Sequence, residues 1–151
     1  MLRQRHELCL ELTVYDAQYR IPWIVFDRDQ VQEFDEIIAE ALCKDINVGW
    51  SNPCFEIWMY AYFGSMPAIQ ESWTCCSNFG RLYETKTGQE YSKADKKMYG
   101  KLCMAGNEEK AIQIAQQKLM QCIREGKTKP SEMCPCTTVH ELVGEIRGKV
   151  N

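Results

Sequence analysis

The sequence lacks any uninterrupted apolar run of the length, about eighteen residues or more, that a membrane-spanning helix requires. Its densest apolar stretch, residues 55–66, contains Glu56, Gly64 and Ser65. The basic N-terminus is not followed by an apolar segment of signal-peptide length. We therefore expect a cytoplasmic protein that does not associate with membranes.

A strong charge of one sign is also missing. The formal net charge is −3 and the pI is about 5.5, so the molecule as a whole does not attract phosphate. Nucleic-acid binding would need a local basic patch. The lysines of residues 93–101 and of residues 127–129 are candidates, although charged surface is the simpler interpretation of both groups.

The nine cysteines show no Cys-x-x-Cys spacing, and their number is odd. Neither a zinc knuckle nor a disulfide framework is therefore predicted. Cysteines within helical patterns are expected to be small core residues. These are Cys9, Cys43, Cys103 and Cys122.

The 151 residues have the composition of one ordinary globular domain, with 45% hydrophobic and 26% charged residues. Residues 2–15 are predicted to form a helix. The all-apolar run Trp23–Phe26 predicts a strand covered on both faces, and apolar spacing predicts a helix over residues 31–43. Residues 46–50 are predicted to form the next strand. Strand, helix and strand with short joins indicate an α/β fold, a small parallel sheet flanked by helices.

The rest of the chain is predicted to be mainly helical. Asn52 and Pro53 are typical of a helix start, with Asn52 as the cap and Pro53 in the first helical position. Residues 64–106 are expected to form loops and short helices, and residues 108–125 a helix. Thr138 and Glu141 have the spacing of a capping box for a last helix.

Two carboxylates follow the first predicted strand directly. Asp27 and Asp29 lie at its carboxyl end, where ligands gather in open parallel sheets. Together they supply hard oxygen ligands of the kind that Mg²⁺ or Mn²⁺ requires. An Asp-x-Asp sequence is also typical of turns, and Asp29 could instead cap the helix that follows.

Further candidate site residues lie downstream. The helix start at Asn52 would present free N–H groups to a phosphate. Glu56 would be a third acidic ligand or a base, or would only complement the helix dipole. Lys93 would steady phosphate charge in a transition state, or would be a surface lysine. His140 is interpreted as a proton shuttle or, more simply, as an exposed histidine on a capped helix.

Four segments in this order resemble the RloB-like family. They are Trp23–Asp29, Ser51–Trp58, Tyr91–Lys93 and Thr137–Val143, and Ser51-Asn-Pro-Cys-Phe-Glu-Ile-Trp58 is the most specific of them.

The resemblance implies a toprim-type fold and a nuclease associated with restriction and abortive-infection loci in bacteria. By position, Asp27, Asp29 and Glu56 would bind Mg²⁺ or Mn²⁺, and Asn52 and Lys93 would contact phosphate. A toprim site also uses a glutamate at the end of an earlier strand. Because the N-terminus has the pattern of a helix, that strand is expected to be absent.

Three functions follow as hypotheses. The first is a magnesium-dependent nuclease of anti-phage defence that cuts DNA or RNA phosphodiesters. The second is a catalytically degenerate interaction module that pairs through an exposed sheet edge with a second copy or a companion defence subunit. The third is a binder of a small nucleotide signal.

Overall fold

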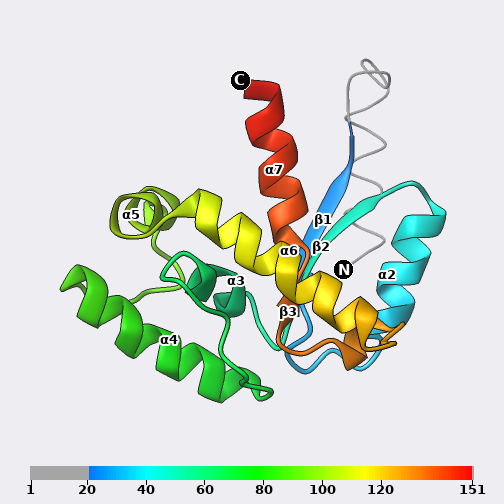
Figure 1. Cartoon of the computed structure of the whole chain (residues 1–151), viewed down its shortest axis with the longest axis horizontal. Coiled ribbons are helices and arrows are strands. Elements are labelled where there is room, and N and C mark those ends of the chain that lie inside the picture. The colour runs from blue at the N-terminus through cyan, green and yellow to red at the C-terminus, as the bar shows by residue number, and fades with distance from the viewer. Residues whose placement is uncertain (1–20, 151) are drawn as a thin grey trace.

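The computed structural model describes residues 21–150, with the side chains of residues 21–148 (Figure 1). The helix predicted for residues 2–15 lies outside this range. The described elements are β1 (Trp23–Asp27), α2 (Phe34–Cys43), β2 (Asn47–Asn52), α3 (Glu56–Ala61), α4 (Ser72–Thr87), α5 (Met98–Ala105), α6 (Glu108–Arg124), η2 (Pro130–Glu132), β3 (Cys136–Thr137) and α7 (Val139–Val150).

The described strands form one three-stranded sheet in the order β1-β2-β3. β1 and β2 are parallel, with Trp23 opposite Asn47 and Asp27 opposite Ser51, and α2 connects them. The predicted strand–helix–strand unit is therefore confirmed. β3 runs antiparallel to β2, so the prediction of a purely parallel sheet is wrong. The sheet is mixed because the two-residue β3, next to Pro135, returns along β2 immediately before α7.

Apolar side chains form two buried clusters, one on each side of the sheet region. One lies between α2 and the strands, where the rings of Phe34 and Trp50 meet edge to face with centroids 5.8 Å apart. The other surrounds α3, whose six residues are all buried among α4, α5 and α6. α3 is thus the central helix of its side, as its place in Figure 1 shows.

The cysteine prediction holds only in part. Cys122 is buried as expected, whereas Cys43 and Cys103 are exposed. Both lie on helices that cover the core with one face only, and both occupy the outer face. Cys9 lies outside the described residues.

The chain after β2 departs from the predicted helix start. Asn52 is the last residue of β2, the Asn52–Pro53 peptide is cis, and α3 begins only at Glu56. The backbone stays extended here because Ser51 and Asn52 pair with β3. The Asn52 side chain therefore does not cap α3. Its amide nitrogen donates instead to the carbonyl oxygens of Pro130 (3.1 Å) and Met133 (2.9 Å).

The segment of residues 64–106 is more regular than predicted. It contains α4, a 16-residue helix, in addition to α5. α4 is anchored by Cys75, Phe79 and Tyr83, which lie four residues apart and are all buried. The Glu71 side chain caps it by accepting from the backbone N–H groups of Trp73 (3.2 Å) and Thr74 (3.0 Å). Within the described part of the chain, no helix is long and apolar enough to cross a bilayer.

Candidate functional site

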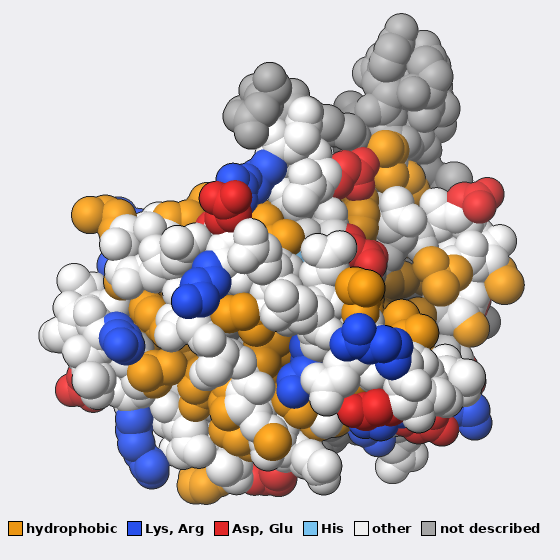
Figure 2. All heavy atoms as spheres, viewed as in Figure 1, with side chains coloured by type: hydrophobic (Ala, Val, Ile, Leu, Met, Phe, Trp, Pro, Cys, Tyr) orange, Lys and Arg blue, Asp and Glu red, His pale blue; other side chains and the backbone are white. Residues whose placement is uncertain are grey.

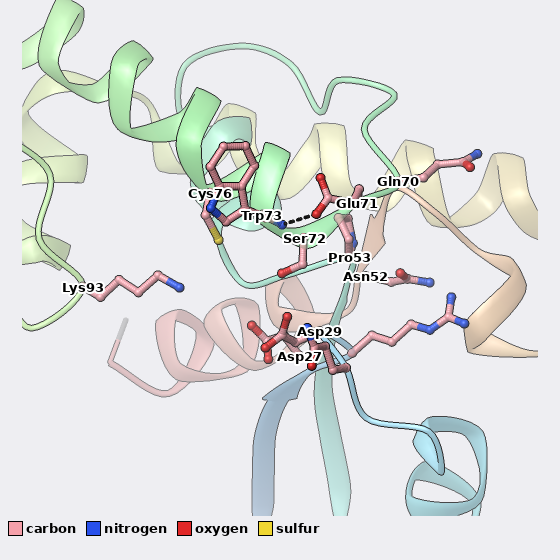
Figure 3. Close-up of a pocket in the computed structure, with 12 residues that line it drawn as sticks. Asp27, Asp29, Asn52, Pro53, Gln70, Glu71, Ser72, Trp73, Cys76 and Lys93 are labelled. Carbon is pink, nitrogen blue, oxygen red and sulfur yellow. Dashed lines mark hydrogen bonds between the residues drawn. The ribbon is translucent and has the colours of Figure 1, made fainter.

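A pocket of about 700 Å³ opens at the carboxyl end of β1 (Figure 3). Its walls come from segments that are far apart in the sequence. They are the end of β1 and the turn after it, the end of β2, the start of α4, and Lys93 in the loop before α5. The pocket therefore lies at the sheet edge where the sequence predicts a site.

Asp27 and Asp29 both line this pocket (Figure 3). Asp27 is half-buried and ends β1, while Asp29 is exposed in the turn that follows. Asp29 has a φ of +39°, a left-handed conformation that aspartate tolerates better than most residues. Its backbone N–H donates to the Pro53 carbonyl (2.9 Å), which fixes the turn against the end of β2.

A backbone hydrogen bond orients the Asp27 carboxylate. Its Oδ2 atom accepts from the N–H of Phe55 (3.1 Å), the residue before the first turn of α3. The negative charge at the start of α3 is therefore supplied by the Asp27 carboxylate. Asn52 lies in β2 and does not open this helix, so that part of the predicted phosphate site is wrong, and the Asn52 amide nitrogen donates to backbone carbonyl groups. Asn52 does line the pocket, and its contact with a phosphate stays a prediction.

Glu56 lies in the first turn of α3 and is 3% exposed. Its Oε2 atom accepts from the Cys76 thiol (3.0 Å), and its Oε1 atom is 3.7 Å from Lys93 Nζ. Among the described residues, one group of three metal-ligating side chains has its ligand atoms within 4.8 Å of one another: Cys54, Glu56 and Cys76. The structure thus places Glu56 with two thiols and does not bring it into such a group with the two aspartates.

Lys93 reaches toward the pocket from the segment before α5, at the left of Figure 3. Its side chain is 68% exposed. Partial burial lowers the pKa of Lys93, and the Glu56 carboxylate with the Cys76 thiol raises it by more, so the net pKa lies above the ordinary lysine value. Lys93 is therefore a cation at neutral pH, available to a phosphate in the pocket.

The thiols beside Glu56 are held in their neutral form. A hydrogen bond with Cys75 and burial raise the pKa of Cys54, and burial together with the Glu56 carboxylate raises that of Cys76. Neither cysteine is therefore a nucleophile of the kind that a lowered pKa would indicate.

Sequence reasoning did not find the α4 side of the pocket. Glu71, Ser72, Trp73 and Cys76 all line it, and the Trp73 side chain is 75% exposed at its edge. An exposed tryptophan beside a polar pocket offers a flat surface on which an aromatic ligand can stack. The sequence carried no signal for this, because the contact depends on how α4 packs against α3.

The fold and the site define a small α/β protein with a pocket lined by two aspartates at the carboxyl end of a parallel strand. The chain belongs to the RloB-like family, since residues 6–146 match the family model of RloB-like proteins. No curated protein and no solved structure matches it.

Proposed function

We propose that this chain is a toprim-type, magnesium-dependent nuclease of bacterial anti-phage defence, which acts on DNA or RNA phosphodiesters. The observation that carries the proposal is that Asp27, Asp29 and the Lys93 cation line the same pocket. Membership of the RloB-like family is consistent with it.

The two aspartates suit Mg²⁺ or Mn²⁺. Mg²⁺ is usually bound by one or two carboxylates, with waters and substrate phosphate oxygens completing its shell. Asp27 and Asp29 supply the carboxylates, and a pocket of about 700 Å³ has room for the other ligands. A divalent ion bound here would polarise a phosphoryl oxygen and activate a water.

The protein's own groups have separate roles in this proposal. Asp27, oriented by the Phe55 N–H, and Asp29, on its left-handed turn, hold the ion at the sheet edge. Lys93 stabilises the negative charge that develops on the phosphate. Glu56 is given no part in binding this ion, because its carboxylate lies against Cys76.

Cleavage of labelled single- and double-stranded DNA, RNA and tRNA in Mg²⁺ or Mn²⁺ tests the proposal. We expect Asp27→Asn and Asp29→Asn to lower the cleavage rate by more than about 100-fold, since loss of outer-shell partners alone costs about 10- to 100-fold. The same variants should lose the heat of Mn²⁺ binding in calorimetry.

Asp45→Asn is the matched control. Asp45 is also an exposed aspartate with positive φ (57°). It lies between α2 and β2, before the amino end of β2, whereas the pocket lies at the carboxyl ends of β1 and β2. This variant should cleave and bind Mn²⁺ like the wild type. A wild-type protein that cleaves none of these substrates would remove the enzymatic proposal.

The sheet favours one alternative, a degenerate module that pairs with another chain. Within the described residues, β1 pairs with β2 alone and is an edge strand. Unpaired edges invite strand addition by a second copy or a companion subunit. A stable dimer without any Mn²⁺ heat would favour this alternative, and a monomer that binds Mn²⁺ would exclude it.

A further inference from the structure

A second ligand cluster lies beside the pocket, made of softer atoms than the aspartate pair. Cys54 comes from the connection between β2 and α3, Glu56 from the first turn of α3, and Cys76 from α4. The packing of α4 on α3 brings Cys76 against the other two, from 22 positions after Cys54 and 20 positions after Glu56. Cys54 and Glu56 are almost fully buried, at 1% and 3% exposure.

The distances between the three ligand atoms are close to those of a tetrahedral zinc site. Cys54 Sγ and Cys76 Sγ are 3.6 Å apart, Cys76 Sγ and Glu56 Oε2 are 3.0 Å apart, and all three ligand atoms lie within 4.8 Å of one another. Two thiolates bound to zinc at about 2.3 Å in tetrahedral geometry lie roughly 3.8 Å from each other. The sulfur pair is therefore already at nearly the required spacing.

The donor set selects the metal. Two thiolates and one carboxylate favour Zn²⁺ over Mg²⁺, which prefers oxygen ligands alone. Cys76 also lines the pocket, so water from the pocket can reach a fourth coordination position.

We propose that Cys54, Glu56 and Cys76 bind one Zn²⁺ ion, with a water from the pocket as the fourth ligand. On binding, the two S–H bonds break, two zinc–sulfur bonds form, and two protons leave to solvent. The resulting complex of one dication with three anionic ligands has a charge of −1. The nearby ammonium of Lys93, 3.7 Å from Glu56 Oε1, compensates that charge.

Such an ion would join the β2–α3 connection to α4, the two segments that form one wall of the pocket. It is a different site from the proposed magnesium site, with no ligand in common. The inference therefore stands or fails independently of nuclease activity.

The test is a titration of reduced, metal-free full-length protein with Co²⁺, which reports thiolate ligation through its charge-transfer absorption. We expect one Co²⁺ per chain with this absorption, and its displacement by one equivalent of Zn²⁺. Cys76→Ser should abolish or strongly reduce the absorption, and Glu56→Gln should weaken binding at least about tenfold. Circular dichroism checks that both variants remain folded.

Two control variants test whether the absorption arises at this cluster. Cys43→Ser removes an exposed thiol on α2 and should leave Co²⁺ binding unchanged. Asp27→Asn should also leave it unchanged while removing the Mn²⁺ heat. The proposal is overturned if the wild type shows no thiolate–cobalt absorption, or if folded Cys76→Ser and Glu56→Gln both bind Co²⁺ like the wild type.

Discussion

His140, the second residue of α7, shows what burial does to a single ionisable side chain. It is 5% exposed, and its Nδ1 atom has no hydrogen-bond partner within the described chain. Burial lowers its pKa below the ordinary histidine value of about 6.5. The sequence-based picture of an exposed histidine is therefore wrong, and the neutral imidazole belongs to the packing of α7.

This burial predicts a pH dependence of stability. Because the folded pKa is depressed, the unfolded state binds the proton more tightly, so the stabilisation is complete above about pH 6.5 and is lost as pH falls. The loss is at most about 1.4 kcal/mol per pH unit for one proton. Urea unfolding of the wild type and His140→Gln from pH 7.5 to pH 5 measures it.

The wild type should lose unfolding free energy more steeply than His140→Gln below pH 6.5, since all other titrating groups are common to both. Parallel curves for the two proteins would show that His140 titrates alike when folded and unfolded.

At the start of α7, tertiary contacts with β2 decide which side chain bonds the first helical N–H groups. Thr138 was predicted to cap this helix, yet its hydroxyl accepts from the Trp50 N–H and donates to the Val48 carbonyl, both at 2.9 Å. Thr137 Oγ1 accepts from the Val139 N–H instead (3.1 Å). The capping-box prediction is wrong because β2 occupies the Thr138 hydroxyl, which joins the helix to the sheet.

Thr138→Val tests this junction. The variant keeps the side-chain shape and removes the hydroxyl from two buried backbone groups, so we expect it to lower the free energy of unfolding by about 1–3 kcal/mol. Thr85→Val is the control, because Thr85 is exposed on α4 and its hydroxyl donates only to the Arg81 carbonyl of its own helix. That change should stay within about 0.5 kcal/mol. Equal losses in urea unfolding would contradict the role given to Thr138.

The elements that the sequence predicted well are those fixed by local pattern. The apolar run at Trp23 places β1, and helical spacing places α2 and α6 to within a few residues. The prediction failed where a distant segment decides the backbone. Asn52 and Pro53 look like a helix start, but pairing of Asn52 with Cys136 extends β2, and the two-residue β3 has no pattern of its own.

The candidate site also contains residues that the local sequence places and residues that only tertiary packing brings together. A strand end positions Asp27 and Asp29 locally, and the sequence could place both at the sheet edge. Glu56 was expected beside them, but the packing of α4 brings Cys76 against its carboxylate. No spacing in the sequence links Cys54 to Cys76, so this cluster became visible only in three dimensions.

At the scale of the whole molecule, charge limits how nucleic acid can bind. The formal net charge is −3. On the face drawn in Figure 2, Lys and Arg side chains are scattered among neutral, apolar and acidic ones. Three of the candidate lysines form ion pairs: Lys93 with Glu56, Lys101 with Asp95 and Lys127 with Glu125. The face drawn in Figure 2 carries no broad basic surface that would hold a phosphate chain, so we expect the pocket to supply much of the attraction.

Lys93 is the candidate lysine that lines the pocket, so its loss should affect nucleic-acid binding most. If nucleic acid enters the pocket, Lys93→Ala should weaken binding and reduce the slope of log affinity against log salt by about one, as expected for one lost phosphate contact. Lys96→Ala is the matched control, because Lys96 is exposed three residues away and does not line the pocket.

Fluorescence anisotropy with a labelled oligonucleotide, across a salt series in Ca²⁺ to bridge phosphate to the aspartates, measures both quantities. Without any divalent ion, Asp27 and Asp29 repel phosphate, so affinity should fall in EDTA for every variant. If Lys93→Ala and Lys96→Ala changed the slope equally, or if EDTA had no effect, the nucleic acid would be bound by diffuse surface charge away from the pocket, and the aspartate pair would have no part in holding it.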